Sequence, residues 1–224
     1  IRGGQPVLEV IFQRLPNTIL LATSAMIIAI LLGVPLGFLA AYNKGTISDT
    51  FIMILAISGI SMPHFWLGLI LLFIFAVDLG WLPVSGSGLL NLVLPALTLG
   101  ISNAAIFARL TRTSMIEILQ QDFVITALAK GLPKKYVLRK HVLRAGLIPL
   151  VTMMGMQFAF MMGGAIVVEN IFSWNGVGRM AVEAIFQRDY PIVTGVFLVV
   201  GLVILLINLL VDLTYGFLDP KVRQ

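Results

Sequence analysis

Long apolar stretches alternate with short polar segments along this chain. Five of the stretches contain no Asp, Glu, Lys or Arg, and they cover residues 15–43, 50–77, 92–108, 145–168 and 190–211. A helix needs about 20 apolar residues to cross a bilayer, whereas barrel strands are shorter and alternate apolar with polar positions. We therefore predict an all-α, polytopic membrane helical bundle with five spans, the third of which extends toward Glu117.

Composition agrees with a membrane protein and argues against several other classes. Charged residues make up 11% of the chain and its mean hydropathy is +1.03, whereas about a quarter of the residues of soluble domains are charged. The absence of cysteine excludes disulfides and thiolate metal sites, and with only two histidines we expect no metal site. The net charge of +5 is divided between loops as membrane topology requires, so we expect no nucleic-acid partner.

The distribution of Lys and Arg predicts which side each loop faces. Residues 109–144 hold eight of the fifteen basic residues, and their side of the membrane, with the 44–49 turn and the C-terminus, holds eleven. Because basic residues collect in cytoplasmic loops, we expect this side to be cytoplasmic. Five spans then leave the N-terminus outside. With no Met at Ile1, we expect a sixth, N-terminal span before it.

The chain shows no repeat and no linker, so we expect one transmembrane domain over residues 1–224. Pro63 and Gly59 interrupt the second stretch and predict a kink near mid-membrane, while Ser48 and Asp49 are expected to cap the start of its helix. Small residues recur at every fourth position in three stretches, which predicts close helix packing. They are Ala25, Ala29, Gly33, Gly37 and Ala41; Ala96, Gly100, Ala104 and Ala108; and Gly155, Ala159 and Gly163.

The basic loop at about 109–144 contains the pattern of two short helices joined by a bend. Gly131 suits a left-handed residue at the end of a helix over 123–130, and Pro133 suits the start of a second helix over 134–144. The loop could instead be a basic anchor on anionic headgroups, worth about 1 kcal/mol per Lys or Arg. An anchor does not need the Gly and Pro of the bend, so the pattern favours docking to a soluble partner.

Motifs along essentially the whole chain resemble one family. Ile125-Thr126-Ala127, followed by Gly131, resembles the "EAA" loop of ABC importer permeases, in the variant form of the dipeptide/oligopeptide/nickel permease family, first permease type. Ile125-Thr126 stands where the general pattern has Glu-Ala, and Arg144 where it often has Pro, which narrows the resemblance to the peptide branch. Other matching segments are Gln5-Pro6-Val7, Arg14-Leu15-Pro16-Asn17-Thr18, Pro63-His64-Phe65-Trp66-Leu67-Gly68, Gly80-Trp81-Leu82-Pro83, Leu94-Pro95-Ala96-Leu97-Thr98-Leu99, Glu117 with Asp122, Val168-Glu169 with Phe172, Gly176-Val177-Gly178-Arg179, Arg188-Asp189-Tyr190-Pro191, and Asn208 with Asp212.

The resemblance implies a type I ABC importer permease fold in a bacterial or archaeal cytoplasmic membrane. It also implies a second homologous permease subunit, two cytoplasmic ATPase subunits that bind ATP and Mg, and an extracytoplasmic solute-binding protein. The chain itself is then a non-catalytic subunit with no cofactor. The loop would dock on the ATPase as a coupling helix, through Thr126, Ala127, Lys130, Gly131, Leu132, Pro133 and Tyr136.

Two further groups are candidates for the transport path and its outer gate. The path candidates are Ser58, Ser61, Met62, Met156 and Met162; the alternatives are a proline kink that serves packing, and methionines that only fill the core. An outer segment at about 169–189 carries the candidates for a gate or for contact with the binding protein. These are Glu169, Trp174 and Arg179, although Glu169 could instead be paired internally because it ends a span.

We expect di- or oligopeptides as cargo, with nickel or glutathione as the alternatives. An ion-gradient-driven carrier is a less favoured alternative, because proton relays need ionisable residues deep in the membrane and only His64 lies at mid-depth. The chain lacks the nucleophile-elbow and metalloprotease motifs of intramembrane enzymes and a phosphate-binding loop, so ATP must be bound by another chain.

Overall fold

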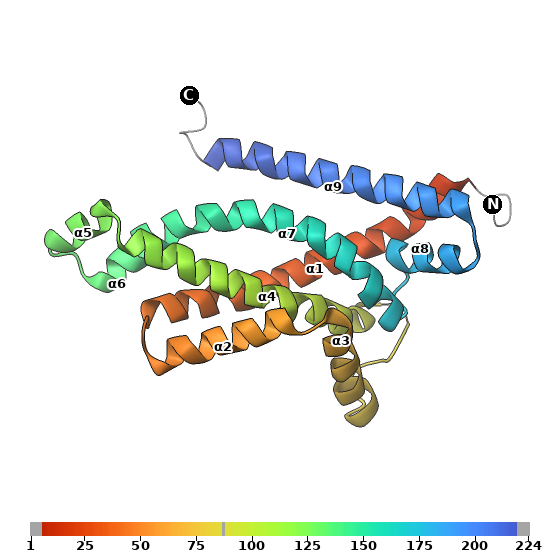
Figure 1. Ribbon diagram of the computed structural model, residues 1–224, viewed down its shortest axis with the longest axis horizontal. Coiled ribbons are helices and arrows are strands. Elements are labelled where there is room, and N and C mark those ends of the chain that lie inside the picture. Colours follow the sequence, from red (N-terminus) through yellow and green to blue (C-terminus); the bar gives the residue numbers. More distant parts are fainter. Residues whose placement is uncertain (1–5, 87, 219–224) are drawn as a thin grey trace.

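The computed structural model describes residues 6–86 and 88–218, and it is a bundle of long helices lying side by side (Figure 1). Short helices cap its two ends: α5 and α6 lie at one end, and α8 lies at the other. We call these the α5–α6 end and the α8 end. The elements are α1 (Val7–Tyr42), α2 (Ile47–Ser61), α3 (His64–Leu72), a π-helical turn η2 (Phe73–Asp78), α4 (Leu89–Leu119), α5 (Asp122–Ala129), α6 (Lys134–Val137), a second π-helical turn η3 (Leu138–Val142), α7 (Leu143–Ile171), α8 (Val177–Phe186) and α9 (Tyr190–Leu218).

The expected all-α membrane bundle is confirmed. Within the described residues, four helices are long and apolar enough to cross a bilayer: α1, α4, the Pro149–Ile171 part of α7, and the Tyr190–Val211 part of α9. The second stretch of the sequence forms α2 and α3, which together make a fifth span if the bent pair crosses as one. The third stretch does extend past Glu117, because α4 continues to Leu119.

The interruption of the second stretch is a break, not the kink that the sequence predicted. The axes of α2 and of the helix that begins at His64 differ by 100°, so α3 leaves the side of the bundle (Figure 1). Met62 and Pro63 both adopt extended backbone angles and end one helix and start the next. The lost hydrogen bond of a proline is thus moved outside both helices.

The small residues of α1 and α4 lie in a close helix contact, as predicted, and the structure shows that the two stripes face each other. A Cβ atom on Gly33 would lie 2.5 Å from the carbonyl oxygen of Ala104, and one on Gly100 would lie 2.7 Å from the side chain of Ile28. The two backbones can approach this closely only because these positions lack a side chain. The third stripe behaves differently: Gly155 packs against Val211 of α9, but Gly163 has open space around its Cα.

Three apolar clusters hold the described part of the chain together. The central cluster joins α1, α4 and α7, and a second one joins α1 to α8 and α9. The third, which we call the loop cluster, connects the ends of α1 and α4 with α5, α6, η3 and the start of α7. Its buried members are Ala41, Met115, Ile118, Val124, Val137, Leu138 and Val142.

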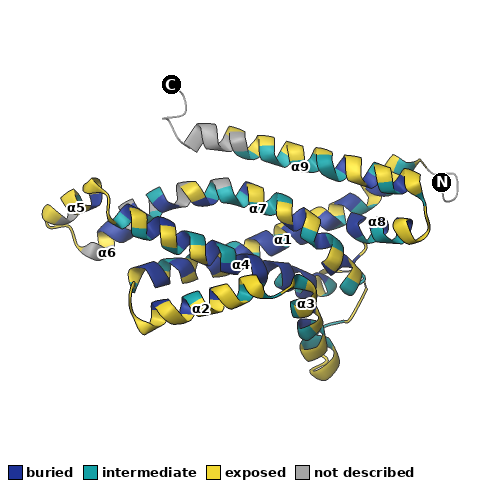
Figure 2. Ribbon diagram, viewed as in Figure 1, coloured by how far each residue is buried: buried dark blue, intermediate teal, exposed yellow. Residues whose placement is uncertain are grey.

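Large apolar side chains also cover much of the outer surface. They lie on α2, α3 and α9, where Figure 2 shows exposed residues along each helix, and Leu198 and Leu205 of α9 are 69% and 67% exposed. Soluble monomers seldom expose apolar patches of this extent. These faces therefore fit a molecule surrounded by lipid or by other membrane helices.

Candidate functional site

The α5–α6 end has the predicted helix–bend–helix shape. The backbone of Gly131 has φ +82°, a left-handed conformation that favours glycine, and Pro133 precedes the first residue of α6. The amide of Lys130 donates to the carbonyl of Thr126 at 3.1 Å and that of Tyr136 to the carbonyl of Pro133 at 2.9 Å. Unlike the separate second helix that was predicted, α6 continues through η3 into α7 without interruption.

The bend places the predicted coupling residues on one exposed surface. Thr126, Lys130, Gly131, Leu132, Pro133 and Tyr136 are exposed, and Ala127 is half-buried. Val124 and Val137, on the other side of the two helices, are buried in the loop cluster. The ammonium of Lys140 contacts Tyr136, with 2.7 Å from Nζ to the hydroxyl. The exposed surface therefore stands on a packed base that joins it to α4 and α7.

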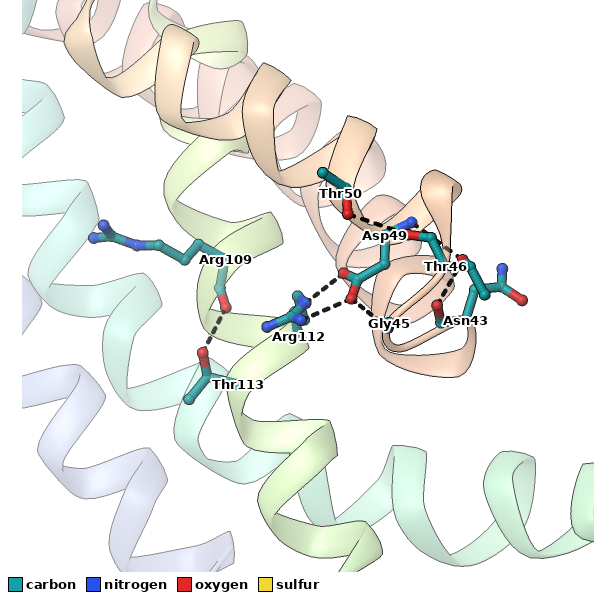
Figure 3. Close-up of polar contacts among 8 residues, drawn as sticks. All are labelled: Asn43, Gly45, Thr46, Asp49, Thr50, Arg109, Arg112 and Thr113. Atoms are coloured by element: carbon teal, nitrogen blue, oxygen red, sulfur yellow. Dashed lines mark hydrogen bonds and ion pairs between the residues drawn. The ribbon is translucent and has the colours of Figure 1, made fainter.

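A partly buried ion pair joins α2 to α4 near this end of the bundle (Figure 3). Arg112 donates two hydrogen bonds to the carboxylate of Asp49, from Nε at 2.6 Å and from Nη2 at 2.8 Å. The amide of Gly45 donates a third, at 2.9 Å, and Asp49 is only 3% exposed. Two parallel charge-assisted bonds are among the strong polar contacts of proteins.

Sequence reasoning missed this pair and misplaced the helix cap beside it. Thr46, not Ser48 or Asp49, is the N-cap of α2, and its hydroxyl accepts a 3.5 Å hydrogen bond from the amide of Asp49. A signal was present in the sequence, because Asp49 is the only acidic residue between Glu9 and Asp78. A carboxylate that enters the membrane region with a span usually pairs with another polar or charged group.

The path candidates on α2 gather at the helix break. A cavity of about 290 Å³ is lined there by Gly59, Ile60, Ser61, Met62, Pro63 and His64, together with Ser102 and Ile106 of α4. A neighbouring, almost entirely apolar cavity of about 360 Å³ includes Ser58 and Met62 in its lining. Ser58 and Ser61 are exposed. The structure therefore brings Ser58, Ser61 and Met62 together around an open part of the surface.

The two methionine candidates of α7 lie in different environments. Met156 is 53% exposed on α7, whereas Met162 is 2% exposed and belongs to the central cluster. Met162 therefore lines no surface of this chain, and its assignment to the path was wrong. Its place agrees with the alternative, in which methionine fills a core.

The outer candidates form an internal network at the α8 end. Glu169 is completely buried, and its carboxylate accepts hydrogen bonds from the Thr18 hydroxyl at 2.6 Å and from the Arg179 amide at 2.9 Å. The indole of Trp174, 6% exposed, donates to the carbonyl of Asn17 at 3.0 Å. Glu169 and Trp174 are therefore not exposed contact residues as proposed from sequence; the internal pairing considered for Glu169 is what the structure shows.

Arg179 is the half-exposed member of the outer group. Its guanidinium donates to the carbonyl of Ser173 at 2.7 Å and pairs with Glu183 at 3.0 Å. Glu183 also lies 3.5 Å from Arg14 of α1. Throughout the described part of the chain, no group of three or more His, Asp and Glu side chains is placed to hold a metal ion.

Comparison with known proteins gives the geometry its context. Residues 33–224 match the family described as binding-protein-dependent transport system inner membrane component. The glutathione transport system permease protein GsiC of Salmonella paratyphi A is 44% identical over 220 residues, which is 98% of this chain and 72% of that protein. GsiC of Escherichia coli K12 is 43% identical over the same shares of the two chains.

Solved structures show the same fold at low sequence identity. A chain of the methionine ABC transporter MetNI, in an inward-facing conformation, superposes with a TM-score of 0.82 at 16% identity, over 96% of this chain and 99% of that one. A chain of an amino acid ABC transporter solved with histidines gives 0.73 at 15% identity, over 93% and 94%. The exposed apolar helices and the matched length agree, and the chain belongs to the family of inner membrane components of binding-protein-dependent ABC transport systems.

Proposed function

We propose that this subunit carries glutathione, or a short peptide much like it, through an ABC importer. As a permease component the chain is a multi-pass inner membrane subunit and not an enzyme, and ATP is handled by partner ATPases. The observation that carries the cargo proposal is the identity of 43–44% to proteins named as glutathione permeases over 98% of this chain. Glutathione was an alternative to di- and oligopeptides on sequence grounds, and we now place it first.

The α5–α6 end is the proposed contact with the ATPase subunits. Leu132 and Tyr136 are 37% and 43% exposed, and exposed aromatic side chains such as Tyr136 are enriched at protein interfaces. The packed base beneath them would pass a displacement on to α4 and α7. This assignment makes the α5–α6 end and the C-terminus cytoplasmic, in agreement with the distribution of basic residues.

The remaining partners follow from the same assignment. The apolar faces of α2, α3 and α9 are available for lipid and for a second, homologous permease subunit. The α8 end then faces outward, where Arg179 is the outer candidate left on the surface to meet a solute-binding protein. The path would run past the helix break, along Ser58, Ser61 and Met62, because non-helical backbone at membrane depth is tolerated where it lines a water-filled cavity.

Transport in proteoliposomes tests the cargo. The full-length protein would be purified with its partner permease and ATPases and reconstituted into vesicles. ATP would be enclosed in the vesicles, and the binding protein and the labelled solute would be added outside. We expect ATP-dependent uptake of labelled glutathione that unlabelled glutathione competes away, with weaker uptake of a neutral dipeptide and none of Ni²⁺. ATP-dependent uptake of the dipeptide alone would return the cargo to the wider peptide class, and uptake without ATP would contradict the importer.

A further inference from the structure

Helix α2 has few buried contacts with the rest of the chain. Its buried residues are Asp49, Ile52 and Ala56, one near each turn along one face, and its other side chains are exposed or half-buried (Figure 2). Ile52 and Ala56 contribute apolar contacts that tolerate sliding. The bidentate pair of Asp49 with Arg112 is the directional attachment among them, because two parallel hydrogen bonds fix both distance and orientation.

The other partner of this pair belongs to the end of α4 that carries the loop. Arg112 lies one turn before Met115, which is 1% exposed, and two turns before Ile118. Both apolar residues are buried in the loop cluster with Val124 of α5 and Val137 of α6. A displacement of α5 and α6 therefore moves the part of α4 on which the Arg112 guanidinium is held.

The far end of α2 lies at the helix break. A helix of 15 residues is about 22 Å long at 1.5 Å per residue and has no proline within it. It ends at Ser61, where the chain turns by 100° beside the cavity lined by Ser61, His64 and Ser102. A short straight helix of this kind transmits movement of its first turn to its last.

The charged groups around the pair do not offer a substitute for either partner. Arg109, one turn before Arg112 on α4, is exposed and points away from Asp49 (Figure 3). Lys44 is also exposed, and its charge acts on the Asp49 carboxylate more weakly than the hydrogen bonds from Arg112 do. Asp49 is buried, so loss of Arg112 leaves its carboxylate uncompensated, and loss of Asp49 removes both hydrogen bonds of the pair; the link therefore depends on both residues.

We propose that the Asp49–Arg112 pair is the joint through which movement of the α5–α6 end reaches the helix break on α2. Asp49 and Arg112 are positioning residues in this role and need not touch cargo or ATP. The proposal rests on the function proposed above, because it presumes that an ATPase moves the α5–α6 end. It adds that α2 moves when the α5–α6 end moves, and that this movement changes the surface lining the transport path at the helix break.

The test separates coupling from assembly in the reconstituted transporter. Residues 1–224 contain no cysteine, so Ser58→Cys gives this part of the subunit a single thiol, on α2 and one turn before the break. The rate at which this thiol is labelled would be measured without nucleotide and after addition of ATP and vanadate. The same measurement would be made in otherwise wild-type protein and with Asp49→Asn, Asp49→Glu or Arg112→Lys. Glu117→Gln is the matched control, because it neutralises an exposed acid on the same helix α4. ATPase bound per permease, basal ATP hydrolysis and uptake would be measured on the same samples.

We expect Asp49→Asn to keep the ATPase bound and hydrolysing, while uptake per complex falls about tenfold or more, as for loss of a coupling interaction. The ATP-dependent change in Ser58→Cys labelling should disappear with it. Asp49→Glu, which retains a carboxylate, should restore part of both, and Glu117→Gln should change neither.

Two results would overturn the joint. In the first, Asp49→Asn shows the same labelling change and the same uptake as the control. In the second, assembly and uptake fall in proportion while the labelling change per complex stays normal. The pair would then only stabilise the fold. Failure of the proposed function looks different, because the wild-type transporter would then show no ATP-dependent uptake at all.

Discussion

The hydroxyl of Thr18 on α1 donates a 2.6 Å hydrogen bond to the buried carboxylate of Glu169 at the end of α7, 151 residues away. The same hydroxyl accepts a 2.8 Å hydrogen bond from the amide of Val177, the first residue of α8. One threonine therefore connects three helices at the α8 end. Because all of these groups are buried, each depends on the others for its hydrogen bonds.

Thr18→Val should destabilise the α8 end. The substitution keeps the shape of the side chain but leaves the Glu169 carboxylate and the Val177 amide short of a partner, at a cost of about 1–3 kcal/mol for each unsatisfied group. Thermal unfolding of the purified transporter would measure the loss as a lower midpoint. Thr23→Val is the control, since the Thr23 hydroxyl is exposed and bonds only within α1, to Ile19; equal midpoints for the two variants would contradict the network.

Gly33→Ala should lower stability through the α1–α4 contact. The added Cβ would lie 2.5 Å from the Ala104 carbonyl oxygen and 2.7 Å from the Cβ of Phe107, so the helices must separate, at a cost of about 1–3 kcal/mol. Gly163→Ala adds the same methyl group to α7, where nothing lies within 4 Å, and should be neutral or slightly stabilising. Thermal unfolding of the two variants in detergent would test this, and equal unfolding midpoints would contradict the prediction.

Gly131→Val should uncouple transport and leave the protein inserted. At φ +82° with open space around it, the new side chain meets no neighbour, so the cost is backbone strain of about 1–3 kcal/mol confined to the bend. We expect loss of ATP-dependent uptake at normal membrane levels of the protein. Gly80→Val imposes similar strain at φ +62° outside the α5–α6 end; if it reduced uptake as much, strain at the bend would not be the reason.

Tyr136→Ala should weaken attachment of the ATPase. Tyr136 is 43% exposed at the tip of the α5–α6 end, and buried tyrosines at interface centres contribute more than about 1 kcal/mol when truncated. Titration of the ATPase onto nanodisc-embedded permease should show an affinity at least about fivefold lower. Tyr190→Ala removes an exposed tyrosine near the α8 end and should leave this affinity unchanged.

Sequence reasoning succeeded where one local property dominates. The apolar stretches are long enough that only membrane helices suit them, and the steps of four in α1 and α4 predicted which face of each helix packs closely. The bend at Gly131 was predictable for the same reason, since a Gly followed two residues later by Pro restricts the backbone locally.

Proline shows where local reasoning stops. Pro16, Pro35, Pro95 and Pro149 all lie inside continuous helices, whereas Pro63 lies at a 100° break. The residue type is the same, and neighbouring helices decide whether the lost hydrogen bond is tolerated within a helix. The sequence could therefore indicate an interruption at Pro63 but not its angle.

The partners within the two polar networks could not be identified from the sequence, for a related reason. Asp49 and Arg112 are 63 residues apart, and Thr18 and Glu169 are 151 apart. Their pairing depends on the rotation of each helix about its axis, which the pattern of apolar residues determines only to within a broad face. The burial of Met162 was missed for the same reason.

The α1–α4 contact also limits where cargo can travel. A seam that has no space for a methyl group at Gly33 or Gly100 cannot open for a tripeptide without separating the two helices at the centre of the bundle. In the proposed function, a solute therefore moves along the outside of this subunit and meets a second wall there. On this view the chain is half of a conduit, and the other half is supplied by whatever faces α2 and α7.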